Sequence, residues 1–115
     1  MGRVSSRKEF EIGSELEDRE LFGQAVEWYT KAAKRGNMFA QNNLGNLYDD
    51  GKGCEKNPAM AVFWYKQAVK SGCAEAAGNL GVHYRQLGKK RWARYWFERA
   101  VAMGDEEAVE EIRNL

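Results

Sequence analysis

The chain has 115 residues, of which 43% are hydrophobic and 30% charged, a composition that can bury a core and is typical of a helix-rich domain. Its formal net charge of +1 argues against a nucleic-acid partner held by bulk charge. No apolar run approaches the roughly 18 residues that a membrane-spanning helix needs, and the opening segment lacks the apolar centre of a secretory signal. We therefore expect one domain over residues 1–115, a cytoplasmic location and no membrane partner.

Several anchor residues recur along the chain at two fixed intervals. Trp28, Trp64 and Trp96 are separated by 36 and then 32 residues. The same intervals separate Gly36, Gly72 and Gly104, then Ala32, Ala68 and Ala100, and also Ala40, Ala76 and Ala108. Fixed periods of this length are typical of solenoids, in which each repeat stacks on its neighbours to complete a core. The sequence therefore predicts about three helix-pair repeats.

The first repeat is expected over residues about 6–36, in a degraded form. Ser6 and Glu9 fit a capping box at the start of its first helix. Gly13 stands where Gly45 stands in the second repeat. A glycine at this position allows a neighbouring helix to approach closely.

The second repeat is expected over residues about 37–72, as two amphipathic helices. Their apolar faces are formed by Ala40, Leu44, Leu47 and Tyr48 in the first helix and by Ala61, Trp64, Tyr65 and Ala68 in the second. Asn57 is a good N-cap, and Pro58 fits the first helical position. The three recurring glycines each follow a helix, where a left-handed C-cap belongs.

The third repeat is expected over residues about 73–104, with a loop between its helices that is shorter than in the second repeat. The acidic tail, over residues about 105–115, predicts a short amphipathic helix that caps the last repeat. Such a cap indicates a self-contained module rather than an internal fragment of a longer repeat array.

The run "AQNNLGNLYDDGKGCEKNPAMAVFWYKQAVKSG" resembles a Sel-1-like repeat. That signature couples an Ala-x-x-x-Leu-Gly-x-x-Tyr helix, a Gly-x-Gly loop and a Lys-Ala-x-x-Trp-Tyr-x-Lys-Ala helix ending in glycine. The third repeat lacks the Gly-x-Gly loop, and in the first only "AVEWYTKAAKRG" fits well. The resemblance implies an all-α, right-handed α/α solenoid similar to tetratricopeptide arrays, and a non-catalytic adaptor function.

Residues with catalytic or metal-binding chemistry are few. His83, the single histidine, occupies the register position of Leu47 and is expected to be a half-buried core residue. Cys54 and Cys73 lack metal-ligand spacing, and the helix between them is too long for one disulfide to span. We therefore expect no enzyme activity, no metal and no cofactor.

The tract "KKRWARYW" mixes basic and aromatic residues, a combination that binds single-stranded nucleic acid in other proteins. The register assigns Ala93 and Trp96 to the core, and the chain is nearly neutral, so we expect no nucleic-acid partner. Its cations lie at a helix start, where the macrodipole disfavours positive charge. We hypothesise that Lys89, Lys90 and Arg91 pair with Asp49, Asp50 and Glu55 of the preceding repeat.

The first helices of such arrays line a concave face, and the register predicts which residues form it. The positions opposite the buried stripe are Phe10, Ser14 and Glu17, then Asn42, Asn46 and Asp49, and finally Gly78, Val82 and Arg85. The candidate partner-binding residues among them are Phe10, Asn42, Asn46, Asp49, Val82 and Arg85. Asparagines can pair with a peptide main chain, and an arginine can bind a carboxylate. The alternative is that these residues simply form a solvent-exposed helix face without a partner.

Residues at other register positions complete the site prediction. Phe63 and Tyr95 share a register position that faces away from the core, and they form a possible second surface if the next repeat leaves them uncovered. Glu27 at this position in the first repeat argues against a continuous stripe. Asn43 and Asn79 precede Leu-Gly in successive repeats and are expected to hydrogen-bond to the adjacent turn.

Two functions remain open from the sequence. The favoured one is an adaptor that binds a protein or peptide segment on the concave face, as a monomer or weak homo-oligomer. The alternative is a structural repeat module that acts through end-to-end or homo-oligomeric association.

Overall fold

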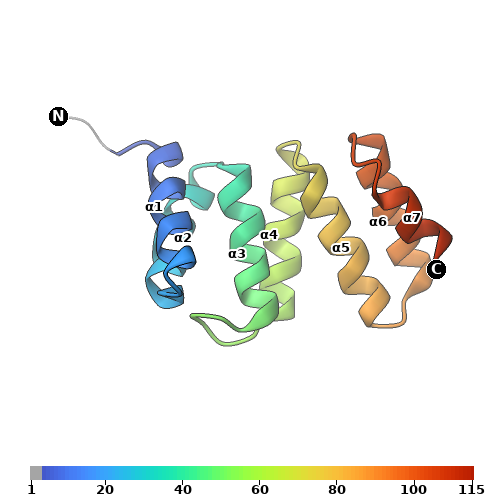
Figure 1. The fold of residues 1–115 in the computed structure, drawn as a ribbon, viewed down its shortest axis with the longest axis horizontal. Helices are drawn as coiled ribbons and strands as arrows, with labels where there is room; N and C mark the ends of the chain where they lie inside the picture. Colours follow the sequence, from blue (N-terminus) through green and yellow to red (C-terminus); the bar gives the residue numbers. More distant parts are fainter. Residues whose placement is uncertain (1–3) are drawn as a thin grey trace.

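The computed structural model describes residues 4–115, so residues 1–3 of the expected domain lie outside the described part of the chain. The helices are α1 (Ser6–Asp18), α2 (Phe22–Lys34), α3 (Met38–Asp50), α4 (Pro58–Lys70), α5 (Ala74–Gln86), α6 (Lys90–Ala102) and α7 (Ala108–Arg113). They follow one another along the long axis of a molecule that measures 50 × 27 × 21 Å, with α1 and α7 at opposite ends (Figure 1).

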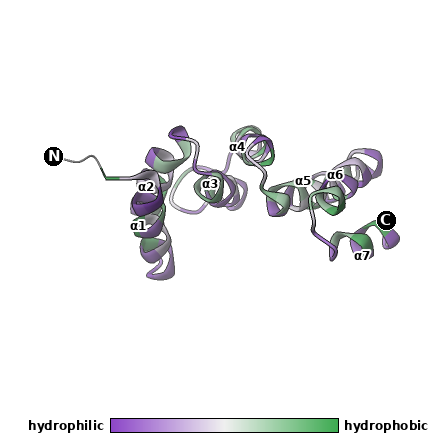
Figure 2. Cartoon of the chain, turned by 90° about the horizontal axis from the view of Figure 1, so that it is seen from above, coloured by the Kyte–Doolittle hydropathy of each residue, from purple (hydrophilic) through white to green (hydrophobic). Residues whose placement is uncertain are grey.

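The helices contact mainly their neighbours in sequence. α1 packs on α2, α3 on α4 and α5 on α6 within each pair, while α2 packs on α3 and α4 on α5 between pairs. The short helix α7 packs on α6. Seen from above in Figure 2, α7 lies to one side of α5 and α6. This arrangement confirms the predicted α/α solenoid with a C-terminal capping helix.

The start of α1 differs from the prediction by one residue. The N-cap is Ser5, whose Oγ accepts a hydrogen bond from the Lys8 backbone N–H at 3.1 Å. Ser6 is already helical, so the predicted capping box of Ser6 and Glu9 is wrong. Glu9 is instead buried, and its Oε1 accepts from the Arg35 guanidinium at 2.9 Å, which ties α1 to the end of α2.

The other predicted helix ends are confirmed. Asn57 Oδ1 accepts from the Met60 backbone N–H at 3.1 Å, and Pro58 is the first helical residue of α4. The three recurring glycines have positive φ: 91° at Gly36, 100° at Gly72 and 109° at Gly104. Each helix pair therefore ends in a backbone conformation that glycine adopts with little strain.

In each repeat, a glycine of the first helix contacts an aromatic ring of the second helix. A Cβ added to Gly13 would lie 2.6 Å from the Tyr29 ring, one at Gly45 would lie 2.7 Å from the Tyr65 ring, and one at Gly81 would lie 2.6 Å from the Phe97 ring. Real Cβ atoms do not approach other atoms so closely. The glycine therefore sets the distance between the two helices of each repeat.

The core consists of two clusters in series. The first joins buried residues of α2 and α3 with Trp64 of α4, and the second joins α4, α5 and α6 with Ala108 of α7. Ala108 stands at the register position of Ala40 and Ala76, both fully buried. Thus α7 occupies the place that a first helix takes in the repeats before it, and it covers the last apolar surface.

None of the helices within residues 4–115 has the length and apolar content required to traverse a lipid bilayer.

Candidate binding surface

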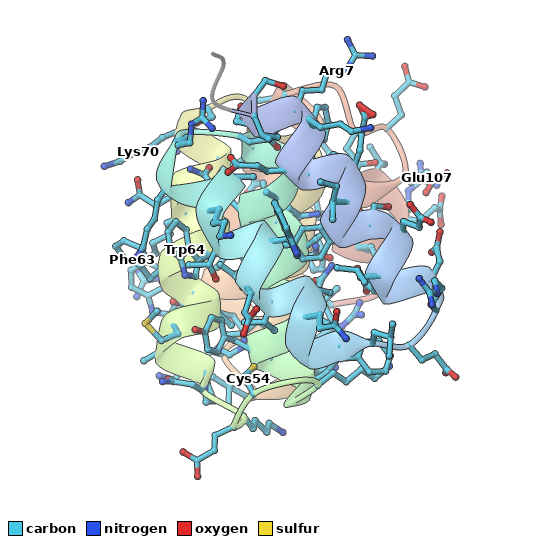
Figure 3. All side chains as sticks on the ribbon, turned by 90° about the vertical axis from the view of Figure 1, so that its left-hand side faces the viewer. Arg7, Cys54, Phe63, Trp64, Lys70 and Glu107 are labelled. Carbon is cyan, nitrogen blue, oxygen red and sulfur yellow. The ribbon has the colours of Figure 1, made fainter. Side chains whose placement is uncertain are left out.

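One side of the array carries most of the predicted partner-binding residues. We call it the first-helix face, and it is the side of the molecule on which α1, α3, α5 and α7 lie. Viewed along the array from the α1 end, Glu107 beside α7 and Phe63 on α4 lie on opposite sides of the molecule (Figure 3). The second helices therefore form a separate, outer face.

Asn42 does not belong to an accessible groove. Its side chain is only 2% exposed, and its Oδ1 accepts from Asn79 Nδ2 at 2.9 Å. Asn79 comes from α5 and reaches back to α3, so the next repeat covers this position. The expectation that Asn42 contacts a partner is therefore wrong, because the amide already serves the contact between repeats.

Asn46 also takes part in this contact, although it remains half-buried. Its Oδ1 accepts from the Tyr65 hydroxyl at 2.6 Å and from Asn79 Nδ2 at 3.3 Å. In the preceding repeat, Asn43 Nδ2 donates to the Tyr29 hydroxyl at 3.3 Å. The recurring asparagines thus bond to side chains of the previous repeat rather than to the adjacent turn that we expected.

Asp49 lies against His83 rather than against the basic tract. Its Oδ1 is 3.3 Å from His83 Nδ1, and His83 is buried, more deeply than the half-buried position that the sequence predicted. Among the described residues, none of the ion pairs within 4 Å involves Lys89, Lys90 or Arg91. The hypothesis that these cations pair with Asp49, Asp50 and Glu55 is therefore wrong.

Arg85 connects the last repeat to the capping helix. Its guanidinium forms an ion pair with Glu111 of α7 and lies 5.5 Å from the centre of the Phe97 ring. Glu111 stands in the register position of Asn43 and Asn79. Its ion pair with Arg85 joins α7 to the preceding repeat, as the hydrogen bonds of Asn43 and Asn79 join the earlier repeats.

Phe10 marks the other end of the first-helix face. Its ring is half-buried, with its centre 5.9 Å from that of Tyr29 and 5.8 Å from that of Phe39. Phe39 is an exposed residue that the sequence did not single out. The structure does not bring Phe10 together with Val82 and Arg85, which lie two repeats away on α5.

A cleft of about 170 Å³ opens between α5 and the segment that leads into α7. Its apolar lining comes from Val82, Phe97 and Ala108. Its carboxylates come from Glu75, Asp105, Glu107 and Glu111. Arg85 pairs with Glu111, while Asp105 Oδ1 accepts from the Glu107 backbone N–H at 3.2 Å. The cleft therefore combines an apolar base with a negatively charged rim.

The outer face carries exposed aromatic side chains. Phe63 is 48% exposed and Tyr95 is 44% exposed, so the next repeat does not cover either of them. Trp92, which the sequence did not single out, is 56% exposed, with its ring centre 6.4 Å from that of Tyr95. Within the part of the chain that the structure describes, no aromatic contact joins Phe63 to Tyr95.

Comparison with known families now gives the repeats a name. The family model described as the Sel1 repeat matches residues 18–37, 39–73 and 74–105. The chain belongs to the Sel1 repeat family. The first match begins at the end of α1, which agrees with the degraded first helix that the sequence indicated.

Solved structures support this assignment. A Sel1 repeat protein from Oxalobacter formigenes has a TM-score of 0.78 and 34% identity over 93% of this chain, which spans 47% of that protein's length. The N-terminal domain of stress-induced protein-1 (STI-1) from C. elegans has a TM-score of 0.76 and 22% identity. The match covers 95% of this chain and 92% of that domain, so the two share a fold. No curated protein sequence matches the chain. Sel1 repeats generally mediate protein–protein interactions and are typically non-catalytic.

The two cysteines and the possible metal ligands were compared with the requirements of reactive sites. Burial raises the pKa of the Cys73 thiol, and it also raises the pKa of the less buried Cys54 thiol. A raised pKa favours the neutral thiol over the thiolate, which is the nucleophilic form. Both cysteines are free. Within residues 4–115, no group of three or more His, Cys, Asp or Glu side chains could hold a metal ion.

Proposed function

We propose that this Sel1 repeat protein is a non-catalytic adaptor that binds a protein or peptide segment on its first-helix face. The observation that carries the proposal is the cleft between α5 and α7. Val82 and Gly78, both at register positions expected to contact a partner, line this cleft. An apolar base with a charged rim is the usual make-up of a site that anchors one side chain of a partner.

The charge of the rim indicates which segments fit. Glu75, Asp105 and Glu107 have no ion pair within 4 Å in the described structure, whereas Glu111 is neutralised by Arg85. A segment that places an apolar side chain on Val82 and a Lys or Arg beside these carboxylates would complement the cleft. Asp49, Asn46 and Phe10 lie further along the first-helix face, where a longer segment would extend.

Gly78 offers a direct test because its missing side chain keeps the cleft open. A Cβ at this position would meet only Asp105 Oδ2, at 3.5 Å, which is an ordinary van der Waals contact. Gly78→Ala should therefore leave the cleft accessible, whereas the longer side chain of Gly78→Gln should fill it. Circular dichroism and thermal unfolding would establish that both variants fold like the wild type.

The experiment is affinity capture from the source lysate with the three immobilised chains, followed by direct titration of each captured protein. A partner that binds the wild type and Gly78→Ala, but binds Gly78→Gln at least about tenfold more weakly, is the expected result. Equal binding to all three chains would contradict the placement of the site. Recovery of only the chain itself would favour the alternative function, self-association.

A further inference from the structure

The outer side of α6 carries an aromatic surface of its own. The ring centre of the exposed Trp92 lies 6.4 Å from that of the exposed Tyr95 and 6.2 Å from that of Tyr84, a partly buried residue of α5 that packs against the core. Trp92, Tyr95 and Arg91 together line a shallow hollow. Large aromatic side chains in a hollow are typical anchors of protein interfaces.

Unpaired positive charge lies next to these rings. Lys89, Lys90 and Arg91 are exposed at the start of α6, and their ammonium and guanidinium groups have no carboxylate within 4 Å in the described part of the chain. The N-cap residue Lys89 makes no side-chain capping hydrogen bond. The macrodipole of this helix adds further positive potential at the same end. These cations are therefore free of direct ion pairs within the described structure.

The fold itself does not require these side chains. Trp92 stands where Met60 and Gln24 stand in the second and first repeats, and Arg91 stands where Ala59 stands in the second. These copies form the same helix pair with other residues at the same positions. The combination of a tryptophan and a cation cluster is therefore specific to α6 and is not needed for stacking the repeats.

We propose that this surface, the α6 outer patch of Lys89, Lys90, Arg91, Trp92 and Tyr95, binds an acidic peptide segment that carries an aromatic or large apolar anchor. The anchor would lie on Trp92 and Tyr95, while the acidic residues would lie beside the cations and the helix N-terminus. The opposite charge of the cleft between α5 and α7 means that the two surfaces select different segments.

A nucleic acid is a poorer fit to the α6 outer patch. Its three cations occupy one turn of one helix, and the formal net charge of the chain is only +1. Binding a phosphate backbone normally needs a broad basic footprint that neutralises several phosphates. A short acidic peptide needs only a few cations next to its anchor.

The test measures the binding of fluorescein-labelled synthetic peptides by fluorescence anisotropy. Each acidic peptide has one Trp, Phe or Leu among Asp and Glu residues, and its control has Lys in place of the acidic residues. We expect at least one acidic peptide to bind about tenfold more tightly than its basic control, and added salt to weaken this binding.

Variants taken from the other repeats keep the fold while they remove the patch. Trp92→Gln and Arg91→Ala introduce the residues found at Gln24 and Ala59, and each should weaken acidic-peptide binding about tenfold. Met60→Gln, the matched change on α4, and Gly78→Gln should leave it unchanged. Because Gly78→Gln fills the cleft but leaves the α6 outer patch intact, this variant distinguishes binding at the patch from binding in the cleft.

Three outcomes would overturn the proposal. The first is that no acidic peptide binds better than its basic control. The second is that Trp92→Gln binds as well as the wild type. The third is that single-stranded RNA, or vesicles of phosphatidylcholine with phosphatidylserine, bind more tightly than every acidic peptide and are displaced by none, which would assign the patch to nucleic acid or to a lipid surface.

Discussion

At the scale of single residues, Gly13, Gly45 and Gly81 control how closely each helix pair packs. The ring of the partner helix occupies the space where a side chain would be, and in Gly81 the partner is Phe97, which is almost fully buried. Gly78 lies one turn earlier on the same helix, where an added Cβ would make only an ordinary contact with Asp105 Oδ2 at 3.5 Å. The two glycines of α5 therefore have different physical roles, which mutation can separate.

Replacing Gly81 by alanine should destabilise the protein, whereas replacing Gly78 should not. In Gly81→Ala the new Cβ would overlap the Phe97 ring, and overpacking of this kind costs typically about 1–3 kcal/mol. In Gly78→Ala the gain in helix propensity, up to about 1 kcal/mol, is not opposed by a clash. Urea unfolding curves would measure both changes. A Gly81→Ala protein as stable as Gly78→Ala would contradict the packing account.

Two buried tyrosines predict how stability depends on alkaline pH. Burial, and then the hydrogen bond to Glu17, raise the pKa of Tyr29 above its usual 10.0. Burial, and then the charges of Asp49 and Asp50, raise the pKa of Tyr65. Below pH 10 both states hold the phenolic protons, so this contribution to stability is fully present. Above pH 10 the unfolded chain loses protons that the folded chain keeps, so the free energy of unfolding falls as pH rises.

The expected slope is about 1.4 kcal/mol per pH unit for each tyrosine that stays protonated. Tyr65→Phe should remove part of this slope, and Phe97 shows that a phenylalanine fits the same register position. Urea unfolding at several pH values above 10 would measure it. If wild type and Tyr65→Phe lose stability equally over this range, the tyrosine does not contribute to the alkaline transition.

At the scale of helices, polar side chains specify how one repeat meets the next. Asn79 donates from α5 to Asn42 and Asn46 on α3, and Asn43 donates from α3 to Tyr29 on α2. These bonds connect neighbouring first helices or a first helix with the preceding second helix. They therefore add directional contacts to apolar stacking.

Removing the Asn79 amide should cost more than removing the Asn43 amide. In Asn79→Ala, Asn42 Oδ1 would remain buried without a donor, which costs about 1–3 kcal/mol. In Asn43→Ala, the Tyr29 hydroxyl still donates to Glu17 at 2.7 Å, so a smaller loss is expected. Chemical unfolding of the two variants gives the comparison. Equal losses would mean that the Asn42 side chain finds water or another donor.

The sequence predicted the helices well because the recurring tryptophans, glycines and alanines mark positions that face the partner helix of the same repeat. The prediction for Asn42 failed because the exposure of this side chain depends on how the next repeat packs against α3. The apolar pattern within one repeat gives no information about that packing. The prediction for the first cap failed because Ser5 and Ser6 both satisfy the composition of an N-cap. Trp92 was missed because its neighbours Ala93 and Trp96 belong to the core.

At the scale of the whole molecule, the array offers two long surfaces with different character. The first-helix face ends in the acidic cleft beside α7, whereas the outer face of α6 carries cations and exposed rings. The interior consists of two apolar clusters that follow one another along the array. A Sel1 array of this kind holds both surfaces in a fixed relation, which suits a protein that brings other proteins together.

The most direct test of the adaptor function is to map a bound segment on the protein by amide NMR. The segment would be the shortest piece of a captured partner that still binds the wild-type chain. We expect the largest shift changes at residues of α5 and α7 around Gly78, Val82 and Glu107, and their loss in Gly78→Gln. Shift changes confined to α2 and α4, or unaltered by Gly78→Gln, would contradict binding on the first-helix face.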